Sequence, residues 1–153
     1  MNEFMKIAVE EAGKGLKRND GGPFGAVVVR NGKIISKAHN RVIKTNDPTA
    51  HAEINAIRKA TKKLKRFDLS DCELYTSCEP CPMCLSAIYW AKMKKFYYGC
   101  TRKDAEKIGF DDKFIYDVLK GKSKKSVKEI KLNRNECLKP FGIWEKKTNK
   151  VRY

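Results

Sequence analysis

Two short motifs place metal ligands beside an acid–base group. His51 and Glu53 stand two residues apart, and Cys81 and Cys84 follow in a Pro-Cys-x-x-Cys segment. One imidazole and two thiolates can bind zinc and leave the last position of a tetrahedral site to water, whereas structural zinc sites are usually closed by protein ligands alone. The ligand set therefore predicts a hydrolytic centre that holds one Zn²⁺ through His51, Cys81 and Cys84.

Glu53 supports the hydrolytic interpretation. On a helix it lies in the same turn as His51 but is displaced around the axis, so its carboxylate can reach a water on the metal without ligating the metal. An alternative remains open, because Cys78 could join His51, Cys81 and Cys84 in a closed structural site. A closed site of that kind would have no use for Glu53.

The segments around these motifs alternate between helical and strand patterns. Proline at positions 80 and 82 opens a helix in which Cys81 and Cys84 share one face, and the helix N-terminus favours their thiolates. His51 is expected in the first turn of the preceding helix, which Asp47 would cap. We predict helices at 3–17, 50–64 and 82–91 and strands at 24–30, 33–38, 73–77 and 95–99. This order indicates an α/β fold with helices on both faces of a central sheet and the site at one sheet edge.

Composition limits the class of protein. A chain of 153 residues suits a single domain, residues 1–153. The N-terminus has no basic and apolar signal pattern, and no stretch is apolar enough to cross a bilayer. Six cysteines without export indicate metal ligands and reduced thiols, so we expect a cytoplasmic protein that has no membrane partner.

The net charge of +16 raises the question of nucleic acid binding. Most of the basic residues are lysines spread from Lys6 to Lys150, which favours a solvated surface over a dedicated polyanion face. The run from Lys62 to Arg66 is the best local candidate for such a face, although it also suits a helix C-terminus. A nucleic acid partner is therefore not favoured, but the alternative stays open.

Two segments carry a family resemblance. Residues 49–53 (Thr-Ala-His-Ala-Glu) and 79–84 (Glu-Pro-Cys-Pro-Met-Cys) resemble the zinc motifs of the cytidine-deaminase-like superfamily. Residues 22–26, 46–48, 75–78, 88–90 and 109–112 are most similar to the small bacterial guanine deaminases. The resemblance implies a three-layer α/β/α sandwich with a central mixed five-stranded sheet. It also implies a homodimer in which residues 132–153 could be exchanged between subunits.

The same resemblance implies hydrolytic deamination of guanine to xanthine and ammonia in purine salvage. Glu53 and Asp112 would be catalytic, with Glu53 moving protons and Asp112 near the leaving amino group. The residues implied to bind the purine are Phe24, Asn40, Trp90 and Tyr153, together with the backbone of Ala52. His39, next to Asn40, is read as a local hydrogen-bonding residue.

Other interpretations remain open for these positions. Isolated aromatic residues such as Phe24 and Trp90 more often pack in a core, Asp111-Asp112 could simply cap a helix, and a terminal Tyr153 is often disordered. The tRNA adenosine deaminases share the zinc motifs and are the nearest alternative, followed by a guanosine deaminase. A zinc or RNA-binding module without catalysis is the third class.

Overall fold

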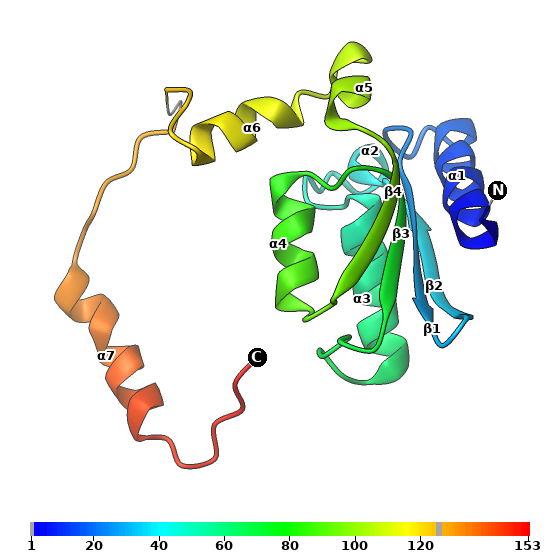
Figure 1. The fold of residues 1–153 in the computed structure, drawn as a ribbon. Helices are drawn as coiled ribbons and strands as arrows, with labels where there is room; N and C mark the ends of the chain where they lie inside the picture. Colours follow the sequence, from blue (N-terminus) through cyan, green and yellow to red (C-terminus); the bar gives the residue numbers. More distant parts are fainter. Residues whose placement is uncertain (1, 125–126) are drawn as a thin grey trace.

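A single mixed sheet organises the computed structural model, which describes residues 2–124 and 127–153 (Figure 1). Its strands are β1 (Gly25–Arg30), β2 (Lys33–His39), β3 (Glu73–Cys78) and β4 (Lys95–Cys100), in the order β2-β1-β3-β4. Strand β1 is antiparallel to both neighbours, whereas β3 and β4 are parallel. The predicted α/β class and all of the predicted strands are confirmed.

Helices cover both faces of the sheet. Helix α1 (Glu3–Lys17) packs on one face, where Ala8 contacts Val27 and Val29 of β1. Helices α3 (Ala52–Leu64) and α4 (Pro82–Trp90) cover the other face over the larger apolar core. The alternation of side chains along β1 serves both cores, because successive residues of a strand point to opposite faces.

The N-terminus of α3 differs from the prediction. The helix begins at Ala52, and His51 is its N-cap in extended backbone, whereas the prediction started the helix at residue 50 with Asp47 as the cap. Asp47 instead accepts hydrogen bonds from the backbone N–H and the hydroxyl of Thr49, at 2.8 and 2.6 Å. This local turn competes with capping for the same carboxylate. As a result, His51 projects from the helix end rather than from its side.

The described part of the chain contains four strands, so the expectation of a five-stranded sheet is not confirmed. After β4 the chain forms α5 (Arg102–Lys107), α6 (Asp112–Leu119) and α7 (Arg134–Lys146), and no further strand pairs with the sheet in the described residues. The fifth strand was implied by the resemblance alone, and no alternating segment after residue 100 supported it.

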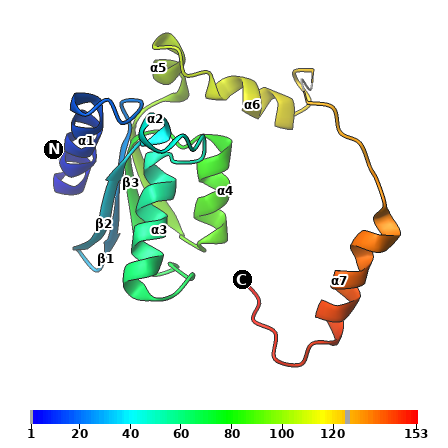
Figure 2. The ribbon, with the colours of Figure 1, turned by 180° about the vertical axis from the view of Figure 1, so that it is seen from behind.

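The C-terminal part extends away from the sheet. Figures 1 and 2 show α6, a long connection and α7 forming an arc, after which the tail returns towards α4. Helix α7 has no buried residue, and Phe141 and Ile143 are 70% and 73% exposed. Among the described residues, no helix is both long and apolar enough to cross a membrane.

Candidate active site

The three predicted ligands meet where α3 and α4 begin. His51 is the N-cap of α3 and Cys81 the N-cap of α4, and Cys84 lies in the first turn of α4. The Nδ1 atom of His51 is 3.5 Å from the Sγ atom of each cysteine. Tetrahedral zinc with bonds of about 2.3 Å to sulfur and about 2.0 Å to nitrogen requires nitrogen–sulfur separations of about 3.5 Å. The residues present therefore fit a zinc ion.

The environment favours ionisation of the Cys81 thiol. A hydrogen bond from Cys84 and a further one from His51 lower the pKa of Cys81 to about 4 against the opposing effect of burial. The pKa of Cys84 is raised, first by its hydrogen bond to Cys81 and then by burial. The interaction with the Cys81 thiolate also raises the pKa of His51. Negative charge thus gathers where two helix N-termini converge, which is the environment that a cation completes.

Cys78 lies outside this group. Its Sγ donates to the carbonyl oxygen of Thr101 at 3.6 Å, and burial raises its pKa to about 12, so it remains a thiol. Within the part of the chain that the structure describes, only His51, Cys81 and Cys84 bring three donor atoms within 4.8 Å of one another. The geometry therefore favours three protein ligands over the closed alternative.

A cavity of about 560 Å³ is lined by two of the three predicted ligands, His51 and Cys81. His51, Cys81, Glu53 and Asp112 line it, so both predicted catalytic carboxylates share one space with the metal ligands. Its volume lies within the range of small-molecule pockets, roughly 300–1,000 Å³. The predicted catalytic residues from α3 and α6 are thus brought together with the metal ligand Cys81 at the start of α4.

Both carboxyl groups resist ionisation at this place. Burial raises the pKa of Glu53 to about 7, and the charge of Cys81 acts in the same direction. Burial, followed by the charge of Cys81, also raises the pKa of Asp112. The neighbouring Asp111 caps α6 by accepting from the Phe114 N–H at 3.0 Å, which frees Asp112 to face the cavity. A carboxyl that can hold a proton near neutral pH is suited to acid–base chemistry.

The cavity is also lined by one amide side chain, that of Asn40, and by two aromatic rings. Asn40 is buried, and its Oδ1 accepts from the Val42 N–H at 3.1 Å. Among the described residues its Nδ2 has no protein partner, and Asn40 lines the cavity as a donor. Phe24 also lines the cavity and meets Phe110 edge to face, with ring centroids 4.9 Å apart. These groups present an apolar slot with one polar anchor.

Two predicted substrate contacts, Trp90 and Tyr153, lie away from the cavity within the chain. Ala52, whose backbone was predicted to bind the base, is fully buried between His51 and Glu53. Trp90 is the last residue of α4, about 13 Å along the helix from Cys81 by helical rise. Tyr153 contacts Trp90 at 5.9 Å between ring centroids, in a separate groove that also includes Phe67. The structure does not bring Trp90 or Tyr153 to the cavity of their own chain.

Sequence reasoning did not assign a role to Phe110 or to the loop at residues 21–23. Both line the cavity, and Phe110 forms its aromatic corner with Phe24. The sequence did contain a signal for both, because residues 22–26 and 109–112 are among the segments similar to the guanine deaminases. Glu79 also lines the cavity and forms a 2.9 Å ion pair with Arg102, the first residue of α5.

Comparison with known proteins agrees with this geometry. A guanine deaminase of Bacillus subtilis (strain 168) is 49% identical over 151 residues, which are 98% of this chain and 97% of the relative. A tRNA-specific adenosine deaminase of Aquifex aeolicus (strain VF5) is 42% identical over 100 residues, which cover 65% of this chain and 66% of that protein.

Two guanine deaminases are among the solved structures that resemble this chain. The X-ray structure of the Bacillus subtilis guanine deaminase matches with a TM-score of 0.93 and 48% identity, covering 100% of this chain and 99% of that one. A guanine deaminase from Nitrosomonas europaea matches with a TM-score of 0.68 and 36% identity over 71% of this chain and 63% of that chain. Residues 1–100 match the cytidine and deoxycytidylate deaminase zinc-binding region. Since this match spans both zinc motifs, the chain belongs to the cytidine and deoxycytidylate deaminase family of zinc-binding proteins.

Proposed function

We propose that this protein is a zinc-dependent guanine deaminase that converts guanine and water into xanthine and ammonia in purine salvage. The observation that carries the proposal is the shared cavity of His51, Cys81, Glu53 and Asp112, which has the ligands and carboxyl groups that hydrolysis of an aromatic amine requires. Near full-length similarity to a guanine deaminase supports the choice of substrate.

The proposed reaction divides its tasks among a few side chains. Zinc, when bound by His51, Cys81 and Cys84, supplies Lewis-acid activation of water at neutral pH. Glu53 accepts the proton of the attacking water and passes it to the ring nitrogen next to the carbon that bears the amino group. This protonation makes the carbon electrophilic, and a further transfer by Glu53 releases the amine as ammonia.

The other cavity residues hold the base. Asn40 Nδ2 is positioned to donate to a purine acceptor, and Phe24 with Phe110 provides apolar surface for a flat ring. Asp112 faces the cavity from α6 and is proposed to accept a hydrogen bond from the amino group as it leaves. The amide of Ala52 would complete the polar wall.

A substrate panel tests this assignment against the RNA alternative, which the similarity of the N-terminal two-thirds to tRNA-specific adenosine deaminases keeps in view. The zinc-loaded protein is incubated separately with guanine, guanosine, adenine, cytosine and a tRNA anticodon stem-loop, and ammonia release is measured. We expect release from guanine at the highest rate. Release from the stem-loop alone would replace the proposed function with RNA editing, and guanosine as the best substrate would shift it to the nucleoside.

Replacing Asp112 with asparagine tests its role with the leaving group. The change preserves the side-chain shape but removes the charge, and the loss of a charge-assisted hydrogen bond of about 1.5–3 kcal/mol lowers turnover about 10- to 100-fold. Steady-state kinetics with guanine measure the effect. Asp111→Asn is the matched control, because Asp111 caps α6 and its turnover should stay close to that of the wild type. Equal turnover of Asp112→Asn and the wild type would remove Asp112 from the mechanism.

We further propose that the protein is a homodimer in which residues 132–153 pass to the partner subunit. The exposed apolar residues of α7 support an exchange, since an isolated helix with no buried face gains little from folding alone. Tyr153 and Trp90 then act at a cavity that two subunits share. The free cysteines fit a reducing compartment such as the cytoplasm.

Deletion of residues 150–153 tests the tail. Loss of one stacking contact of about 1–3 kcal/mol is expected to lower guanine turnover roughly tenfold without loss of zinc. If the tail crosses between subunits, mixing the truncated protein with Glu53→Gln protein restores part of the activity through hybrid dimers. Unchanged turnover of the truncated protein would contradict a role for Tyr153, and absence of restoration would contradict the exchange.

A further inference from the structure

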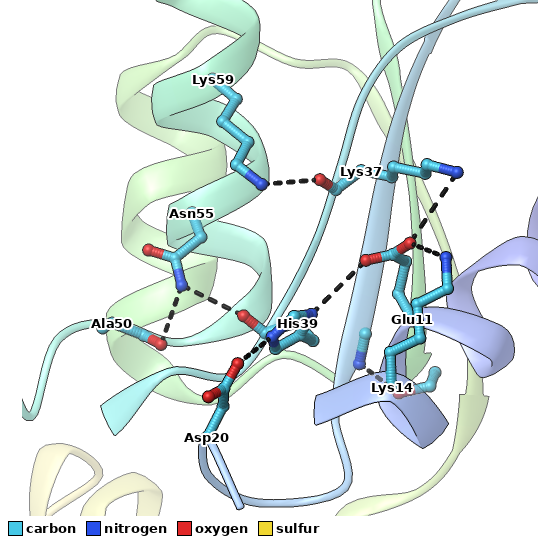
Figure 3. Close-up of polar contacts among 10 residues, drawn as sticks. Glu11, Lys14, Asp20, Lys37, His39, Ala50, Asn55 and Lys59 are labelled. Atoms are coloured by element: carbon cyan, nitrogen blue, oxygen red, sulfur yellow. Dashed lines mark hydrogen bonds and ion pairs between the residues drawn. The ribbon is translucent and has the colours of Figure 1, made fainter. Parts of the chain in front are cut away.

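A buried charge cluster lies behind the wall of the cavity that carries Asn40. His39, at the end of β2, places Nε2 2.8 Å from Asp20 Oδ2 and Nδ1 3.4 Å from Glu11 Oε2. Figure 3 shows the imidazole between the two carboxylates, with Lys14 and Lys37 on the far side of Glu11. Lys14 pairs with Glu11 at 2.7 Å and Lys37 at 3.8 Å. None of these residues has a role in the proposed reaction.

The imidazole of His39 bridges two buried carboxyl groups. Asp20, Glu11 and His39 are each less than 9% exposed, and both ring nitrogens face a carboxylate oxygen. The ring therefore links Glu11 of α1 to Asp20 at the start of the cavity loop. The hydrogen bond from His39 is the largest cause of the lowered pKa of Asp20, and together with Lys14 it lowers that of Glu11 despite burial.

The cluster is joined to the cavity through the loop that begins at Asp20. Gly21 and Gly22 line the cavity, and a Cβ atom at Gly21 would lie only 2.1 Å from Asn40 Oδ1. The backbone of this loop therefore lies directly against the side-chain amide of Asn40, the group proposed to bind the purine. The Asp20 carbonyl oxygen also accepts from the Lys44 N–H at 3.0 Å, which ties the loop to α2 (Val42–Thr45).

His39 has a second connection through its backbone. Its carbonyl oxygen accepts from Asn55 Nδ2 at 3.1 Å, and the same amide donates to the Ala50 carbonyl oxygen at 3.0 Å, one residue before the ligand His51 (Figure 3). Gly15 of α1 packs so closely that a Cβ atom there would lie 2.9 Å from His39 Cδ2. His39 thus contacts α1, the cavity loop and α3, while the next residue, Asn40, lines the cavity.

We propose that His39, held between Asp20 and Glu11, is a positioning residue that fixes the loop at residues 20–23 against Asn40 and so shapes the purine-binding wall. This proposal rests on the proposed function in one respect, that guanine is the bound substrate. Because Asn40 and the loop contact the bound base rather than the water or the leaving amine, the cluster acts on the binding of the purine. Its loss affects KM and leaves the metal ligands in place.

The test uses His39→Gln, Asp20→Asn and the double variant, each as the zinc-loaded full chain. We expect KM for guanine to rise at least about tenfold, because a displaced binding wall costs this much or more, with kcat within about threefold of the wild type. Zinc content stays at that of the wild type. The double variant is expected to match the single ones, since both changes remove the same contact. Asp71→Asn, which removes a carboxylate from an exposed ion pair with Arg30, is the control and keeps the wild-type KM.

Any other result would reject either the positioning role of His39 or the assignment of guanine as the substrate. An unchanged KM with a lower melting temperature would make the cluster purely structural, and a fall in kcat or in zinc content at constant KM would also overturn the proposal. If His39→Gln does not fold, Asp20→Asn, which preserves the shape of the side chain, decides alone. Absence of guanine turnover in both the wild type and Asp71→Asn would instead reject the proposed function.

Discussion

Replacing Glu53 with glutamine is expected to lower guanine turnover by at least about 10²-fold while zinc content and purine binding are retained. Glutamine has nearly the same size as glutamate but cannot accept and release a proton. Glu53 is buried at the cavity, and it is displaced from the group of metal ligands, so the change removes proton transfer and leaves zinc binding intact. Single-turnover kinetics with guanine, together with elemental analysis, measure both effects.

Glu73→Gln is the matched control for this experiment. Glu73 lies on β3 outside the cavity and pairs with Lys95 at 3.5 Å near the surface, where an ion pair contributes little. The same chemical change there should leave turnover close to that of the wild type. Turnover of Glu53→Gln at the level of this control would show that another group moves the protons.

Removing either metal-ligating thiol is expected to abolish both metal binding and activity. Cys81→Ala and Cys84→Ala each leave two protein ligands, and affinity for zinc falls by more than the roughly 10- to 100-fold cost of losing a group that only orients a ligand. Elemental analysis after dialysis and guanine turnover are measured on the same samples. Cys78→Ala is the control, since Cys78 donates to the Thr101 carbonyl oxygen and lies outside the ligand group.

The control separates the two kinds of zinc site. Retained zinc and activity in Cys78→Ala are expected for a centre with three protein ligands. Loss of zinc from Cys78→Ala, in a protein that still unfolds cooperatively, would indicate that Cys78 closes a structural site and would remove the basis for hydrolysis.

The metal site could be predicted from the sequence because its parts are local. Cys81 and Cys84 belong to one helix start, and helix geometry alone places their sulfur atoms on one side. The position of His51 followed from the edge at which both helices begin, although the helix proved to start one residue after it. Asn40 was expected to contact substrate, and the structure places it at the cavity.

Other features depend on contacts that no local pattern records. The role of Phe110 requires β4 and α5 to return the chain to the cavity mouth, and the pairing of His39 with Glu11 and Asp20 joins residues 28 and 19 positions apart. His39 was interpreted as a local hydrogen-bonding residue, but both of its side-chain contacts are distant in the sequence. Trp90 and Tyr153 were assigned by resemblance, and within one chain they form a different groove.

Isotope labelling tests the central claim most directly. The zinc-loaded protein is incubated with guanine in water enriched in oxygen-18, and the purine product is examined by mass spectrometry while ammonia is quantified. Hydrolytic deamination predicts xanthine that carries one oxygen atom from the solvent, formed in equal amount with ammonia. Unaltered guanine after prolonged incubation with protein of confirmed zinc content, under conditions in which an anticodon stem-loop adenosine is converted to inosine, would contradict the account.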